Sequence, residues 1–285
     1  MKDIKIILLC SKTNIQKWVV NPRIYSIAIF IIAFLGYHSF GLSQFAVEMD
    51  FKLTPWVFPH LFTPPVLQIF ALFALLLFCD APFVDKHMPF LITRTGRRNL
   101  IIGQFCYIIF ASIIYTLFVF IVSILVFIPN LQIDSNWGAF MQILSENLND
   151  IPETVTIFFD SEIIHKLTAL QATIISLGLF CLVSIFIGVT TFLFNILIGR
   201  MSGIVVVSFF IFISYFVVYV GGLTLGKGIN FISPISWMSL SSLDWSNTGR
   251  VPTPIFASIC LFLLIIFMGT LAVIVFNKKD VQFQK

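Results

Sequence analysis

Long apolar runs are the feature of this 285-residue sequence that most constrains its fold. A lipid bilayer has a hydrocarbon core about 30 Å thick, which a helix of roughly 20 mostly apolar residues can cross. Six runs of 19 to 29 residues meet that requirement, whereas a membrane β-barrel has short segments of alternating hydropathy. The predicted spans cover residues 24–42, 66–84, 100–128, 168–195, 203–222 and 255–276.

The composition excludes both a soluble and a disordered chain. Hydrophobic residues make up 59% of the sequence, charged residues make up 11%, and the mean hydropathy is +1.02. Soluble domains carry about 25% charged residues, and disordered chains have low hydrophobicity. We therefore predict an all-α integral membrane protein, with a six-helix transmembrane domain at residues 23–276 and a tail at 277–285.

The distribution of cations predicts the orientation of the spans, because cytoplasmic loops carry an excess of lysine and arginine. If both termini face the cytoplasm, the inner segments contain 13 of the 17 cations and the outer segments contain nine of the 13 acids. The inner segments are then 1–23, 85–99, 196–202 and 277–285, and the outer ones are 43–65, 129–167 and 223–254. We therefore predict that both termini are cytoplasmic.

Residues 1–22 have the pattern of an amphipathic helix that lies on the inner leaflet. Three lysines are expected to face the lipid head groups, and the apolar side chains are expected to face the lipid. The apolar set is Ile4, Ile7, Leu8, Ile15, Trp18 and Val19. Asn21 and Pro22 should end this helix and turn the chain into the first span, since the residue before a proline disfavours helix. A disordered basic tail is the alternative.

Motifs for catalysis, metal binding and nucleotide binding are missing from the sequence. It contains no HExxH or CxxC pattern, and its five cysteines do not suggest a disulfide framework or a zinc site. Residues 221–228 approach the phosphate-loop pattern, but Gly228 stands where a serine or threonine would hold magnesium. We therefore predict a protein that is not an enzyme, has no cofactor or metal and does not bind nucleic acid.

The inner segment between the second and third spans is a candidate docking site. It contains the apolar residues Phe90, Leu91 and Ile92, followed by a cationic group around a glycine. That group is Arg94, Gly96, Arg97 and Arg98. Apolar residues beside fixed charges suit a soluble protein partner, and a basic loop lying on anionic lipid is the alternative.

An outer apolar segment at 231–238 is too short to cross the bilayer and is interrupted by a proline. Phe231, Pro234 and Trp237 mark it as a re-entrant or interface-lying segment. A second outer segment, at 137–148, has apolar residues at helical spacing and predicts a short interfacial helix.

Taken together, these features resemble the type-2 ABC transporter permeases, the six-helix membrane subunits of bacterial exporters. The resemblance rests on the amphipathic helix ending at residues 18–23, the six spans with cytoplasmic termini, the basic loop leading into residues 100–104, and the interrupted apolar segment before the last span. Gln104 departs from the pattern, because the family commonly has lysine there.

The resemblance implies a permease in the bacterial cell membrane that works with a separate cytoplasmic ATPase, in two copies, and with a second permease, identical or sister. Residues 86–98 would be the coupling helix that contacts the ATPase. The first and fifth spans would form the permease seam, where Gly36, Gly41, Gly221 and Gly222 allow close approach. The cargo class would be a hydrophobic or amphipathic peptide, antibiotic or drug. A non-transporting immunity or sensory protein of the same fold is the alternative function.

Overall fold

A computed structural model describes residues 2–83, 95–146, 151–199 and 201–278, and these residues are helical apart from turns, loops and one isolated β-bridge. Among these described residues, five helices are long and apolar enough to cross a membrane. They are α2 (Pro22–Glu48), α5 (Arg97–Leu125), α8 (Ala169–Leu197), α9 (Ser202–Phe216) with its continuation to Gly221, and α11 (Pro254–Lys278). The chain is therefore a multi-pass helical protein of the membrane type, as predicted.

The second predicted span is shorter than expected. Helix α3 covers Val66–Phe78, so its 13 residues rise only about 20 Å, and the predicted helix beyond Phe78 is wrong. The chain turns at Cys79 because Asp80 is polar and Pro82 has no backbone N–H to continue a helix. Among the described residues, five long helices and one short apolar helix therefore stand where the sequence predicted six spans of 19 to 29 residues.

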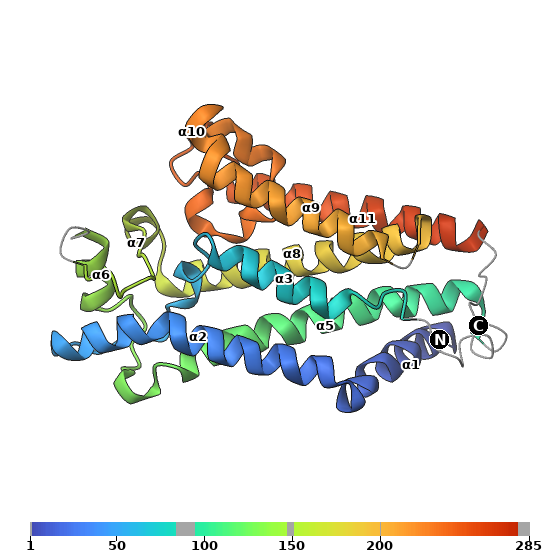
Figure 1. Cartoon of the computed structure of the whole chain (residues 1–285), viewed down its shortest axis with the longest axis horizontal. Helices are drawn as coiled ribbons and strands as arrows, with labels where there is room; N and C mark the ends of the chain where they lie inside the picture. The colour runs from blue at the N-terminus through green and yellow to red at the C-terminus, as the bar shows by residue number, and fades with distance from the viewer. Residues whose placement is uncertain (1, 84–94, 147–150, 200, 279–285) are drawn as a thin grey trace.

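The long helices run side by side, and the connecting segments gather at the two ends of the bundle (Figure 1). One end, which we call the outer end after the predicted topology, carries α6 (Ala139–Glu146) and α7 (Ser161–Lys166). The other, the inner end, carries the start of α1 (Lys2–Gln16) and the end of α11. The two described ends of the chain therefore lie at the same end of the bundle.

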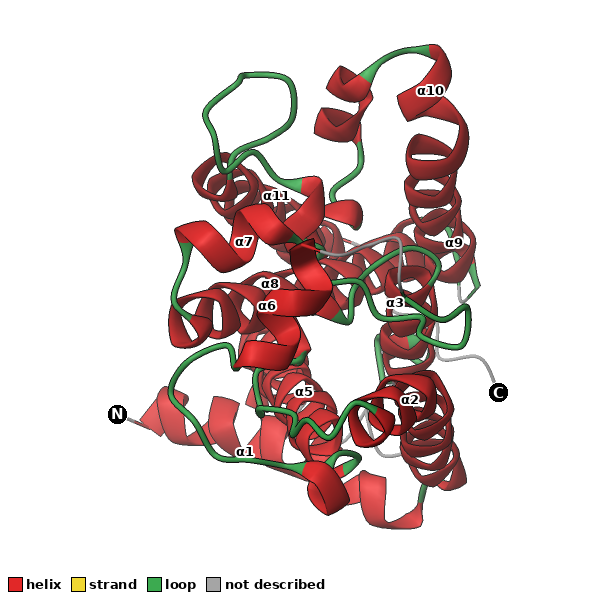
Figure 2. Cartoon of the chain, turned by 90° about the vertical axis from the view of Figure 1, so that its left-hand side faces the viewer, coloured by secondary structure: helices red, strands yellow, loops and turns green. Residues whose placement is uncertain are grey.

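Helix α8 is the central helix of the bundle. It packs against α3, α5, α9 and α11, and Figure 2 shows it between α5 and α11 with α2, α3 and α9 along the opposite side. In its most apolar stretch 61% of the residues are buried, against 17% for α11. The start of α8 is fixed by a capping box, in which Thr168 and Gln171 satisfy backbone groups at the helix end. The long helices that surround α8 keep exposed apolar faces, as expected for contact with lipid.

An aromatic cluster joins the outer end to the bundle. The ring of Phe180 in α8 lies 4.8 Å from Phe62 and 6.0 Å from Phe58, which belongs to the 3₁₀ turn η2 (Phe58–His60). It also lies 6.1 Å from Phe70 in α3 and 5.3 Å from Tyr115 in α5. Each such pair contributes about 0.5–1.5 kcal/mol beyond the burial of apolar area. The first outer segment is therefore packed on three helices at once.

Candidate functional site

The predicted coupling segment is only partly described. Its apolar group, Phe90, Leu91 and Ile92, and the first cation, Arg94, lie outside the described residues. Gly96 precedes α5 with a φ of +81°, a left-handed conformation that glycine adopts readily. Arg97 and Arg98 form the first turn of α5, and both are exposed. The cationic end of the segment is therefore available to a partner at the inner end.

Helix α1 is docked on the first turns of α5. A Cβ placed on Gly103 would lie 2.7 Å from the Cβ of Cys10 and 3.1 Å from the carbonyl oxygen of Ile7, so this contact requires glycine. The amide of Asn99 donates to Asp3 with a separation of 3.3 Å. An α-helix therefore covers residues 2–16 of the predicted amphipathic segment, and it packs against another helix of the same chain.

The two faces of α1 differ from the prediction in part. Ile4 and Leu8 are exposed beside Lys5, as expected for a face that meets lipid. Ile7 and Ile15, which were expected on the same face, are half-buried instead. Their side of the helix packs on the bundle together with the buried residues Cys10, Ser11 and Asn14. A row of apolar residues on one face of a helix therefore predicts a buried face, but it does not predict whether lipid or another helix covers that face.

The predicted break after α1 lies where α2 begins. A 3₁₀ turn, η1 (Lys17–Val20), ends at Asn21, whose side chain accepts from the backbone N–H of Arg23 at 3.1 Å, and Pro22 is the first residue of α2. Trp18 in this turn donates from Nε1 to the hydroxyl of Tyr107 in α5 at 2.8 Å. Trp18, Asn21 and Pro22 therefore fix the corner between α1 and α2.

The short segment Cys79–Phe83, which we call the loop foot, leads from α3 into the predicted coupling segment. Arg23 at the start of α2 holds it: the guanidinium forms an ion pair with Asp80 and donates to the sulfur of Cys79. The same guanidinium donates to the carbonyl oxygen of Leu76 at 3.4 Å. Asp80, the acid that the sequence places inside the second span, is therefore neutralised by a cation at the start of α2.

A second side chain holds the loop foot from the opposite side. Asn195, in the last turn of α8, donates to the carbonyl oxygen of Ala81 at 2.7 Å and accepts from the backbone N–H of Gly203 at 2.7 Å. The ring of Phe83 lies 4.7 Å from that of Tyr107. Sequence reasoning missed Asn195, Tyr107 and the role of Arg23. A lone amide in an apolar run was the one signal available for Asn195.

The outer segment around Trp237 is buried in protein over residues 233–240, whereas its first turn has no buried residue. It consists of the 3₁₀ turns η6 (Lys227–Ile232), η7 (Ser236–Met238) and η8 (Leu240–Ser242), of which η7 packs against α8. Pro234 and Trp237 are buried, and Trp237 donates from Nε1 to the carbonyl oxygen of Asn230 at 2.8 Å. Phe231 stays 38% exposed and contacts Phe256 of α11 at 5.2 Å. The segment returns into the protein without crossing the bundle.

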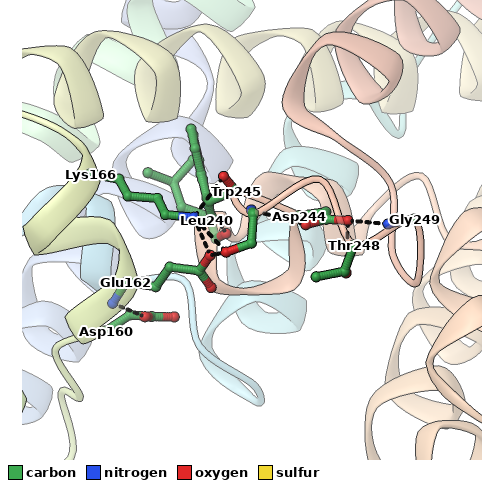
Figure 3. Close-up of polar contacts among 9 residues, drawn as sticks. Asp160, Glu162, Lys166, Leu240, Asp244, Trp245, Thr248 and Gly249 are labelled. Carbon is green, nitrogen blue, oxygen red and sulfur yellow. Dashed lines mark hydrogen bonds and ion pairs between the residues drawn. The ribbon is translucent and has the colours of Figure 1, made fainter.

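Helix α7 is joined to the loop that follows η8 (Figure 3). Lys166 donates to Glu162 and to the carbonyl oxygen of Trp245, both at 2.9 Å, and the hydroxyl of Ser246 donates to Glu162. The indole of Trp245 donates to the carbonyl oxygen of Leu240 at 2.9 Å. These contacts link the outer segment before α8 to the outer segment before α11.

Asp244 organises the same loop. Burial raises the pKa of this carboxyl, but hydrogen bonds outweigh burial and hold the pKa below its usual range. The donors are the hydroxyl of Thr248 at 3.0 Å, the backbone N–H of Gly249 at 2.7 Å and that of Ser246 at 3.0 Å. The carboxylate is therefore held as an anion by the loop that it closes.

His60 is a neutral histidine inside the outer end. Its ring is 3% exposed and lies 5.2 Å from Trp137 and 5.0 Å from Phe159. Nδ1 accepts from the backbone N–H of Asp160 at 3.4 Å, and Nε2 has no partner among the described residues. Burial lowers the pKa of His60 from 6.5 to about 3, because the ring is desolvated.

Acid should therefore destabilise the outer end through His60. Its pKa is lower in the folded state, so the unfolded chain binds more protons between pH 6.5 and 3, and stability is lost as the pH falls through this window. Between pH 7 and pH 5 the loss is about 2 kcal/mol, or about 5 °C in the melting temperature. Melting curves at both pH values should show this loss of stability for the wild type and for the exposed control His165→Gln. The loss should be smaller for His60→Leu. Equal pH dependence of all three proteins would contradict the assignment.

The described residues contain no group of three side chains able to hold a metal ion. Comparison with protein-family models, with curated proteins and with solved structures finds no match. The functional argument therefore rests on the sequence pattern and on the geometry of this chain.

Proposed function

We propose that the chain is the membrane-spanning permease subunit of an ATP-driven exporter of the type-2 ABC kind. It would lie in the bacterial cell membrane with both termini in the cytoplasm. A separate ATPase, in two copies, would bind the segment at residues 86–98, and a second permease, identical or sister, would complete the transporter. The chain itself would not hydrolyse ATP.

The observation that carries this proposal is the way in which both flanks of the predicted coupling segment are anchored. On the N-terminal side the loop foot is bonded to α2 through Arg23 and to α8 through Asn195. On the C-terminal side the exposed pair Arg97 and Arg98 opens α5, on which α1 is docked through Gly103. A loop that merely covers lipid does not need rigid attachment at both ends, whereas a lever between a soluble motor and the helices does.

The exposed apolar faces of the membrane helices bear on the seam between permeases. Gly36 in α2 has open space where a Cβ would stand, so it is free for a close approach of a second chain. Gly41 is not free for such an approach, because the backbone of Thr154 in the same chain already occupies the space where its Cβ would stand. Gly221 is likewise covered, by Ile229. The proposed seam therefore involves the inner and middle part of α2.

The proposed cargo is a hydrophobic or amphipathic compound such as a peptide, antibiotic or drug. The alternative function, a non-transporting immunity or sensory protein, would keep the same fold without a motor. Purification of the tagged chain from its native membrane, followed by identification of bound proteins, separates the two. A stoichiometric soluble ATPase supports the exporter, and its absence under conditions that preserve other membrane complexes supports the alternative.

A further inference from the structure

At the loop foot, segments distant in sequence meet through directional polar bonds on both the α2 and the α8 side. Arg23 reaches it from 56 and 57 residues away, and Asn195 reaches it from 114 residues away. Arg23 contacts three acceptors on the foot and on the end of α3, namely Leu76, Cys79 and Asp80. A planar guanidinium with several partners is held in one orientation, so it resists displacement in more than one direction.

Asn195 connects the foot to α9 as well as to α8. Its amide nitrogen is bonded to Ala81, and its amide oxygen is bonded to the first turn of α9 at Gly203. The approach is close there, since a Cβ on Gly203 would lie 2.3 Å from the carbonyl oxygen of Thr191. If the foot shifts by about 1 Å, these hydrogen bonds must break or the start of α9 must follow, because bonds stretched beyond 3.5 Å lose their strength.

We propose that Arg23 and Asn195 are positioning residues that carry movement of the coupling segment through the loop foot into α2 and α9. This inference rests on the proposed function. Helix α3, which leads directly into the foot, has only 13 residues. The two ties bring in two long helices, α2 and α9, of whose most apolar stretches only 33% and 28% of the residues are buried. ATP binding and closure of the ATPase would then displace both α2 and α9, on either side of α3, and change the distance between them.

The ties can be tested in the full-length chain alone, in lipid nanodiscs. Hydrogen–deuterium exchange should report the amides of Ala81 and Phe83, which donate to the carbonyl oxygens of Phe78 and Asp80 at 2.9 and 2.8 Å. Breaking a charge-assisted tie should raise their exchange roughly tenfold in Asp80→Asn, and Asn195→Leu should do the same. The exposed-cation control Arg250→Gln and the middle of α8 should exchange as in the wild type.

The transmission is tested in the complex with the co-purified ATPase. Spin labels are attached to Val47→Cys and Leu225→Cys, which are both exposed at the outer end. They report the distance between the end of α2 and the end of α10 (Gly222–Thr224), the helix that continues α9. In this background the native cysteines are replaced by alanine, except Cys79, which is replaced by serine. Adding ATP with vanadate should change this distance in the parent. In Asp80→Asn the ATPase should still bind while the distance change is lost.

Rescue distinguishes positioning from a general structural role. The exchanged pair Arg23→Asp with Asp80→Arg should restore the distance change, whereas a destabilised protein would not recover it. A full distance change in both Asp80→Asn and Asn195→Leu, or wild-type exchange of the foot in both, would overturn the inference. Absence of an ATPase from the unmodified preparation would overturn the proposed function instead, and the exchange result would then stand as a property of the fold alone.

Discussion

Gly41→Leu is expected to detach the outer segment before α7 from α2 and to lower the stability of the protein by about 3 kcal/mol or more, or about 10 °C in the melting temperature. The side chain would collide with backbone, because a Cβ at this position lies 1.9 Å from the carbonyl oxygen of Thr154 and 2.6 Å from its carbonyl carbon. Moving that backbone would also break the hydrogen bond that the hydroxyl of Thr156 donates to the carbonyl oxygen of His38 at 3.0 Å, and the 2.8 Å hydrogen bond between this hydroxyl and Nδ1 of the same histidine.

Gly36→Leu is the matched control for this prediction. It lies on the same helix, and a Cβ there meets nothing within 4 Å. Leucine has a better helix propensity than glycine by roughly 0.8–1 kcal/mol, so the monomer should not be destabilised. Melting curves in detergent should therefore separate the two variants clearly. A Gly41→Leu protein as stable as Gly36→Leu would mean that the outer segment does not pack on α2 in this way.

Leu91→Asp is expected to abolish binding of the ATPase. A carboxylate in the apolar centre of a protein interface must be desolvated without a partner, and loss of a central anchor costs more binding energy than loss of a charge at the rim. The double variant Arg97→Glu with Arg98→Glu removes exposed charges at the start of α5. It should weaken binding mainly at low salt, because exposed charges act at long range and are screened.

Pull-down of the ATPase at two salt concentrations checks this pair of variants. Both should still insert in the membrane with wild-type topology, because cations elsewhere on the inner side remain. Unchanged pull-down and ATP hydrolysis with Leu91→Asp would mean that this segment lies on lipid and does not contact the ATPase. That result would remove the strongest residue-level support for the exporter.

Hydropathy predicted the long helices well, and the reason is physical. The third and sixth spans, expected at 100–128 and 255–276, are the helices Arg97–Leu125 and Pro254–Lys278, since a run of apolar residues this long has few other stable conformations. Hydropathy failed for the second span. The sequence stays apolar beyond Phe78, but the helix ends there because Pro82 cannot continue it and Asp80 meets a cation.

The contacts of the inner end could not be predicted from local patterns. Asp80 follows α3 and Arg23 stands in the first turn of α2, and periodicity carries no information about which side chains of different segments meet. Glycine spacing indicated close helix packing, yet Gly41 approaches a loop backbone and Gly103 approaches α1. A small residue predicts a close contact without predicting the partner. The sequence therefore predicted the elements and their order, and the structure was needed for the side chains that join them.

The mass of the intact complex purified from its native membrane tests the central claim most directly. Native mass spectrometry should find two soluble ATPase subunits together with two permease chains, this one and an identical or sister copy. The same purification of Leu91→Asp should give permease without ATPase. A wild-type preparation that contains this chain with no ATPase, or one whose ATPase content is unaffected by Leu91→Asp, would contradict the account.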